Sequence, residues 1–531
     1  MKKFLALLPL LGLIFVACDD DDDGTEMETM VEVTNGSADF SNYVALGNSL
    51  TAGFSDGALF RSGQAASLPN MLATQFALAG GGSFEIPLMA DDLGGMTLNG
   101  MADLNGDGIP EFDNRFILSF ASGSPTPTRL GGQGSTEITN TLSGSFNNMG
   151  VPGAKSYHLL APGYGNVAGI AAGLANPYFA RFASGPTATV LGDAVAQNPT
   201  FFTLWIGNND VLGYVTAGGA GIDQSGNMDP STYGGSDISD PSVVAGSIQG
   251  ILEAMAATGA EGVIANLPDV TTIPFLTTVP FAPLSPANPD FAPQIPALNA
   301  QFAGLNQAFD FLGFPDRKLE FSTTAASAVV IKDEDLVDLS AQLTQVLIGG
   351  GLDAGTATVL GLVYGQARQA TAEDLLVLTS QGVIAEPNAD AFAFLQDLGV
   401  DAATAGQLSV NGITWPLEDQ WVLTPEEQAT ANTALMAYNQ LIEQLAQTFD
   451  LAFVDANALL ANINENGFPL ADGSLVTSVF ATGGGFSLDG VHPSPRGYAI
   501  LANAFIGAIN EKYGSTLPEV NPLAFTGLYL N

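Results

Sequence analysis

Apolar runs of strand length recur along the chain, at residues 43–47, 200–206, 262–267 and 451–454. Such runs are typical of strands that are covered on both faces. An N-cap followed by a proline at the first helical position occurs twice. It occurs at Thr424-Pro425, between the last two runs, and at Ser494-Pro495, after the last run. The pattern therefore predicts helices that run to about Phe449 and Lys512. A further helix is indicated at residues 243–257, where apolar side chains recur at helical spacing. Strands that alternate with helices predict an α/β fold with a parallel sheet.

The first run stops at Gly47, and Ser49 follows two positions later. This arrangement predicts a strand that ends in a tight turn and presents a hydroxyl at its carboxyl edge, which is where open α/β sheets bind ligands. A serine at such a position is more commonly a turn residue than a nucleophile. The interpretation changes only because other segments supply the groups that a nucleophilic serine needs.

Those segments read N-M-G-V-P-G at residues 148–153, G-N-N-D at 207–210 and D-G-V-H-P at 489–493. Together with G-N-S-L at 47–50, they resemble, in order, the G-D-S-L, N-x-G-x-x-G, G-x-N-D and D-x-x-H-P blocks of the SGNH, or GDSL, hydrolases. The first block departs from the family pattern, because Asn48 replaces the usual aspartate. We therefore expect different hydrogen bonding around the serine.

The resemblance implies a three-layer α/β/α sandwich with a mostly parallel, flavodoxin-like sheet, and a serine esterase or lipase that needs no cofactor for catalysis. It implies a catalytic Ser49 with Asp489 and His492. It also implies an oxyanion hole formed by the N–H groups of Ser49 and Gly153 and by the side-chain amide of Asn209.

The composition agrees with this choice of base, because the chain has only two histidines. A serine hydroxyl is a weak nucleophile until a base takes its proton. His492 is the natural base, and Asp489 in the same loop can hold its tautomer. His158 lies beside Leu159 and Leu160, which indicates a structural role.

A rival motif follows the first block, since Gly53-Phe54-Ser55-Asp56-Gly57 fits the G-x-S-x-G elbow of the α/β-hydrolases. An elbow requires a strand that runs directly into the serine. The strand signal ends at Gly47, so we rank Ser49 above Ser55.

The segment 271–423 separates the third block from the fourth and has a looser pattern. Helices are predicted within it at residues 297–312, 336–348 and 354–369. We expect residues 41–270 and 424–531 to form the hydrolase domain, and 271–423 to be a large, mainly helical insertion. This insertion is either a cap over the site or a packing layer without a role in catalysis.

The amino-terminal end reads as a targeting segment. Two lysines precede an apolar stretch that is too short to span a bilayer comfortably, and the only cysteine, Cys18, follows it. The segment 1–17 resembles a bacterial lipoprotein signal peptide, which implies a lipid anchor at Cys18. The aspartates at 19–23 resemble the surface-export signal of Bacteroidetes-type lipoproteins, and residues 18–40 have the composition of a flexible tether. The expected location is the outer membrane, facing the cell surface. The other interpretation of the aspartates is a solvated acidic linker.

Residues 103–111 read D-L-N-G-D-G-I-P-E, with the oxygen ligands and the glycine spaced as in calcium loops. A structural calcium site would use Asp103, Asn105, Asp107, Ile109 and Glu111. The alternative is a turn built from Asn-Gly and Asp-Gly pairs.

The net charge is −41, with 13 Lys and Arg among 531 residues, so nucleic acid is excluded as a partner. The expected substrate is an ester, either of a lipid or of an acylated glycan. The apolar composition of 271–423 favours lipid or medium-length acyl chains over the alternative, a carbohydrate O-acetylesterase. The alternative from another functional class, which is not an enzyme, is a non-catalytic surface-binding lipoprotein on the same scaffold.

Overall fold

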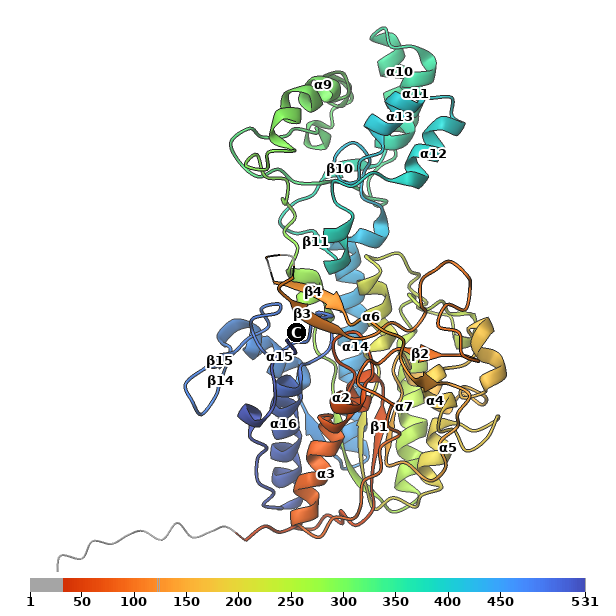
Figure 1. Cartoon of the computed structure of the whole chain (residues 1–531), viewed down its shortest axis with the longest axis vertical. Helices are drawn as coiled ribbons and strands as arrows, with labels where there is room; N and C mark the ends of the chain where they lie inside the picture. Colours follow the sequence, from red (N-terminus) through yellow and green to blue (C-terminus); the bar gives the residue numbers. More distant parts are fainter. Residues whose placement is uncertain (1–31, 122, 124, 531) are drawn as a thin grey trace, which may run out of the picture. The chain divides into compact units, whose positions relative to one another are not determined.

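The computed structural model describes residues 32–121, 123 and 125–530. It contains a five-stranded sheet in the order β13-β8-β7-β1-β6. The strand β1 of this sheet is labelled in Figure 1. The neighbouring strands all run parallel. The fold is therefore mixed α/β around a parallel sheet, as the apolar runs predicted. The strands are β1 (Tyr43–Gly47), β6 (Asn148–Gly150), β7 (Phe201–Trp205), β8 (Glu261–Ala265) and β13 (Ala452–Val454).

The register aligns the carboxyl ends of the three strands that lead into the first three motif blocks or form their start. Gly47 at the end of β1 pairs with Gly150 of β6 on one side and with Trp205 of β7 on the other. The turns that follow these strands consequently meet at one edge of the sheet. This edge brings together segments that are far apart in the chain.

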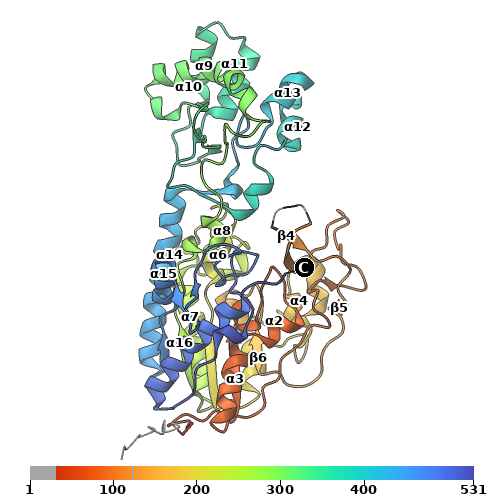
Figure 2. The same ribbon diagram turned by 60° about the vertical axis from the view of Figure 1, so that its left-hand side comes forward.

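Three long helices pack around this sheet. The helix α14 (Pro425–Thr448) packs against α7 (Pro241–Ala256) (Figure 2). The helix α16 (Pro495–Tyr513) packs against β8 and β13. The N-caps predicted from the sequence are confirmed, because the Thr424 hydroxyl accepts from the Glu427 N–H and the Ser494 hydroxyl accepts from the Gly497 N–H. Burial of their apolar faces against the sheet stabilises all three helices.

Residues 271–423 contain several helices, joined by long stretches without regular structure, and have their own cluster of buried apolar side chains, which includes Phe302, Leu343 and Tyr364. The predicted helix at 354–369 is too long, because α11 ends at Tyr364. Residues 367–369 instead form β10, which pairs with β9 (Val330–Lys332). The α-helices in this segment are α8 (Pro274–Thr277), α9 (Ile295–Leu312), α10 (Ser340–Gly349), α11 (Ala354–Tyr364), α12 (Ala389–Asp397) and α13 (Ala402–Leu408).

An ion-pair network lies just beyond the end of α11. Arg368 in β10 donates to Asp333 at 2.6 Å and to Asp374 at 2.7 Å. Both carboxylates are buried, so Arg368 supplies the partner that a buried charge requires.

Within the described part of the chain, none of the helices has the length and apolar character needed to cross a bilayer. The segment 1–17, Cys18 and the aspartates at 19–23 lie outside the described residues.

Candidate functional site

Ser49 is the first residue of α1 (Ser49–Ala52), directly after β1 and the N-cap Asn48. The Asn48 side chain is fully buried. Its Oδ1 accepts from the Leu50 N–H at 3.0 Å, and its Nδ2 donates to the Asn208 Oδ1 at 3.1 Å. An ionised aspartate can accept at both positions but cannot donate. The asparagine at this position thus ties the start of α1 to the third motif block.

Two glycines allow α1 to lie directly on the sheet edge. A Cβ at Gly47 would overlap the Trp205 carbonyl oxygen and the Thr51 hydroxyl, and a Cβ at Gly150 would overlap the Ala52 backbone nitrogen. Because backbone atoms cannot move aside as a flexible side chain can, any larger residue would push α1, and with it Ser49, off the edge.

Ser49, His492 and Asp489 are joined by hydrogen bonds, although Ser49 is more than 400 residues away from the other two in the chain. The Nε2 of His492 lies 2.9 Å from the Ser49 hydroxyl, and its Nδ1 lies 2.9 Å from the Asp489 Oδ2. His492 and Asp489 sit in the loop before α16. The arrangement can move a proton from the serine to the imidazole.

The carboxylate of Asp489 is held in its ionised form. Burial alone would raise its pKa, but the imidazole partner and the hydrogen bonds from the backbone N–H groups of Val491 and His492 lower that pKa to about 2. An ionised Asp489 can only accept. The Nδ1 of His492 must therefore carry the proton, which leaves Nε2 free to accept from the Ser49 hydroxyl.

The three expected oxyanion donors follow β1, β6 and β7 at the same edge. Asn209 begins α6 (Asn209–Thr216), and its Nδ2 donates to the Ala154 carbonyl at 2.9 Å, next to Gly153. An amide nitrogen has a second N–H to offer. Gly153 adopts a φ of 80°, which favours glycine. Ser49, as the first helical residue, has an N–H without an acceptor inside its helix.

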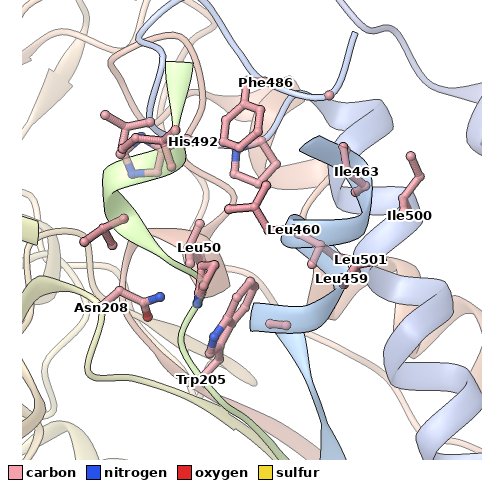
Figure 3. A pocket seen from close by; sticks show the side chains of 18 of the residues that line it. Leu50, Trp205, Asn208, Leu459, Leu460, Ile463, Phe486, His492, Ile500 and Leu501 are labelled. Carbon is pink, nitrogen blue, oxygen red and sulfur yellow. The ribbon is translucent and has the colours of Figure 1, made fainter. Parts of the chain in front are cut away.

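An apolar pocket opens beside the Ser49–His492 pair (Figure 3). Side chains of α15 (Ala456–Asn466) and α16 form one wall, and His492, Leu50 and Asn208 lie opposite. The cavity volume is about 100 Å³, which is smaller than the roughly 300–1,000 Å³ of typical small-molecule sites. Asn209 also lines the pocket, whereas Gly153 is not among the described residues of its wall. The apolar wall consists mainly of Leu50, Trp205, Leu212, Val270, Ile273, Leu459, Leu460, Ile463, Phe486, Ile500 and Leu501.

Ser55 does not lie in the strand–turn–helix elbow that the G-x-S-x-G motif requires. The chain between β1 and Ser55 forms α1, so no strand runs into it. Its side chain is 1 % exposed, and its hydroxyl donates to the Pro493 carbonyl at 3.3 Å. Ser55 thus supports the loop that carries His492.

His158 lies away from this triad, in a short 3₁₀ helix at Ser156–Leu160. Its Nδ1 accepts from the Lys155 N–H at 3.0 Å, and its ring stacks on Tyr164. Burial lowers the pKa of His158 to about 4, which keeps the ring neutral. These contacts agree with the structural role predicted for it.

In the loop at 103–111, the side-chain oxygens of Asp103 and Glu111 accept from backbone N–H groups of the loop itself. Over residues 32–121, 123 and 125–530, no group of three or more His, Cys, Asp or Glu side chains is gathered as a metal site would require. The oxygen-rich donor set is nevertheless of the kind that calcium prefers. Calcium binding stays a prediction, which a melting curve with and without EDTA would test.

Comparison of the chain with models of protein families, with curated proteins and with solved structures gives no match.

The sequence did not predict two of the residues that donate hydrogen bonds to the Asp489 carboxylate. The Gly57 N–H donates to its Oδ2 at 2.8 Å, and the Ser487 hydroxyl donates to its Oδ1 at 3.0 Å. Ser487 in turn accepts from the Asp56 N–H at 2.9 Å. In the sequence, Asp56 and Gly57 stood out only as the end of the G-x-S-x-G motif, and no local pattern connects them with a loop more than 400 positions away.

Asp56 itself is buried, with a side chain 2 % exposed. Its Oδ1 accepts from the Leu488 N–H at 2.8 Å, while its Oδ2 has no hydrogen-bond partner among the described residues. Burial raises the pKa of Asp56 to about 7, and the nearby charge of Asp489 contributes, against the opposing effect of the Leu488 N–H.

This raised pKa predicts how Asp56→Asn changes stability. The folded chain holds the Asp56 proton more tightly than the unfolded chain does. The contribution of this proton to the free energy of unfolding is therefore fully present below about pH 4 and is lost as the pH rises through 7. Asparagine cannot ionise. Relative to the parent, the free energy of unfolding of the variant should therefore rise between pH 4 and 8, by on the order of 3–4 kcal/mol. Urea unfolding at both pH values measures the change, with Asp290→Asn at an exposed position as the control. If the difference in free energy of unfolding between Asp56→Asn and the parent were the same at both pH values, the prediction would be wrong.

Proposed function

We propose that this chain is a serine esterase of the SGNH type that hydrolyses carboxylic esters through an acyl-enzyme. The observation that carries the proposal is the hydrogen-bonded series Ser49–His492–Asp489 at the carboxyl edge of a parallel sheet. Two further features support it. The first is the position of Asn209 beside the turn that contains Gly153. The second is the apolar pocket that opens at the serine.

In the proposed mechanism, the Ser49 oxygen attacks the ester carbonyl while its proton moves to the Nε2 of His492. The carbonyl oxygen becomes an oxyanion and accepts from the N–H groups of Ser49 and Gly153 and from the Asn209 amide. The C–O bond to the alcohol then breaks, and His492 returns the proton to the leaving oxygen. Water, activated by His492, attacks the acyl-enzyme in the same way and releases the acid.

The apolar pocket supports hydrocarbon acyl chains as the substrate class in preference to acetyl groups. An acetyl group would leave most of the wall formed by Leu459, Leu460 and Ile463 uncovered. Each methylene buried there would contribute about 0.8 kcal/mol. The proposed substrate is therefore a lipid-like or medium-chain ester, and the O-acetylesterase is the alternative outcome of a chain-length screen.

We also propose the three-layer arrangement and the role of 271–423 as an inserted cap. Contacts of α16 and α14 with the strands β8 and β13 support the layers. The cap is supported by the Phe275 N–H, which donates to the Gly490 carbonyl at 2.9 Å, and by Leu378, which lines a second hollow together with His492.

The proposed location is the outer surface of the cell, with a lipid anchor at Cys18. Its support is the sequence of residues 1–23 alone. Protease treatment of intact cells tests it, because a protein that stays protected until the outer membrane is broken does not face outward.

Two measurements test the esterase proposal. A fluorophosphonate probe should label the parent protein and fail to label Ser49→Ala, because the probe reacts with an activated serine oxygen. A series of p-nitrophenyl esters of increasing acyl length should give the highest kcat/KM beyond acetate. Absence of both labelling and hydrolysis would favour the non-catalytic binding protein.

A further inference from the structure

His492 also lines a second hollow, which is distinct from the acyl pocket. Half-buried apolar side chains from distant parts of the chain line this hollow together with Asp489 and His492. Partly exposed apolar side chains gathered beside a reactive group are typical of a ligand-binding surface. The residues that the argument uses are Phe54, Phe116, Phe275, Leu378, Phe480 and His492.

The one cationic side chain among the described residues of this wall is already engaged. Arg129 lies over the Phe116 ring at 3.7 Å and donates to the carbonyls of Gly57 and Asn114. It is also 3.5 Å from a carboxylate oxygen of Asp113. The hollow therefore offers hydrocarbon contacts in preference to an anion site.

The positions of the catalytic groups distinguish the two cavities. Ser49, which carries the acyl group, and Asn209, an oxyanion donor, line the first pocket. His492 lines both cavities, whereas Asp489 is among the described lining residues of the second hollow alone, and neither Ser49 nor Asn209 is among those residues. His492 is the group that must protonate the leaving alcohol oxygen. The alcohol therefore has to extend to the His492 side.

We propose that the second hollow binds the alcohol portion of the ester and selects hydrophobic alcohols larger than ethanol. This inference rests on the proposed esterase function and extends it to the leaving group. The substrate would then be apolar on both sides of the ester bond, with the acyl chain in the first pocket and the alkyl or ring portion of the alcohol in the hollow.

The segment 271–423 contributes directly to this hollow through Phe275 and Leu378. Phe275 is fixed to the catalytic loop, since its N–H donates to the Gly490 carbonyl at 2.9 Å. Gly490 has a φ of 73°, and a Cβ there would lie 3.0 Å from the Phe275 nitrogen. Such a close backbone approach keeps the wall of the hollow in place beside His492. Alcohol selection is thus the specific task that the geometry assigns to this segment.

The test compares esters of one acid with ethanol, octanol and cyclohexylmethanol, whose leaving oxygens have similar basicity. A second series varies the acyl chain with ethanol fixed. We expect the parent kcat/KM to rise at least about tenfold from the ethyl to the larger alcohols, as one or more buried methylenes allow. Leu378→Ala should reduce this alcohol preference several-fold and leave the acyl preference unchanged.

Leu460→Ala, which alters the wall of the acyl pocket, is the matched control and should give the reverse pattern. The acyl-enzyme no longer contains the alcohol, so Leu378→Ala should also leave the deacylation rate unchanged. Melting temperatures of both variants show whether they fold. Hydrolysis without alcohol preference, or a Leu378→Ala effect on acyl preference alone, would overturn the inference. Loss of all hydrolysis and of fluorophosphonate labelling in the parent would instead reject the esterase proposal.

Discussion

Ser49→Ala should lower kcat by at least about 1,000-fold, whereas Ser55→Ala should stay within about tenfold of the parent. The first variant removes the only oxygen that lies 2.9 Å from the His492 Nε2 in the described structure. The second removes a hydroxyl that donates to the Pro493 carbonyl at 3.3 Å, a contact that supports the loop without touching the reacting atoms.

His492→Ala should lose about as much as Ser49→Ala, and the double variant should be hardly worse than either single variant, because the pair acts as a unit. Steady-state hydrolysis of a p-nitrophenyl ester measures all of these variants. A dead Ser55→Ala beside an active Ser49→Ala would reverse the assignment and replace it with the elbow motif.

Local patterns in the sequence predicted those parts of the fold that local residues determine. The apolar run ending at Gly47 located β1, and the N-caps at Thr424 and Ser494 located the starts of α14 and α16. The strand β6 was missed, because Asn-Met-Gly has no strand periodicity. Its extended form depends on pairing with Ala45–Gly47, about a hundred residues earlier.

In the site, too, residues in local motifs could be predicted from the sequence, whereas contacts between distant segments could not. The motif blocks pointed to Ser49, Asp489 and His492 because their residue types and order are readable in the sequence. Asp56 could not be assigned in this way, because its contact with Ser487 joins positions that are 431 residues apart. The two cavities beside His492 likewise depend on packing between distant segments, which the spacing of apolar residues does not reveal.

Asp489→Asn is the second change for which we expect a large loss of kcat. The loss follows from the hydrogen-bond donors that surround the Asp489 carboxylate. The Oδ1 of Asp489 accepts from the Ser487 hydroxyl and from the N–H groups of Val491 and His492. In asparagine, the amide oxygen must occupy this position, because a nitrogen there would face three donors. The amide nitrogen is then directed at the His492 Nδ1.

An amide N–H that faces Nδ1 forces that nitrogen to accept and moves the imidazole proton to Nε2. The Nε2–H would then donate to the Ser49 oxygen and could not take its proton. The same amide nitrogen would face the Gly57 N–H, which loses its acceptor. We expect kcat to fall by about 10³–10⁴ with little change in KM.

Ser487→Ala is the matched control, because it removes one donor to Asp489 and leaves the tautomer of His492 unchanged. It should lose only about tenfold in kcat, since the remaining donors still hold the carboxylate. Hydrolysis rates and melting temperatures of the two variants measure both effects. If Asp489→Asn stayed folded and within tenfold of the parent, the carboxylate would not set the tautomer of His492. The proton transfer from Ser49 would then need another explanation.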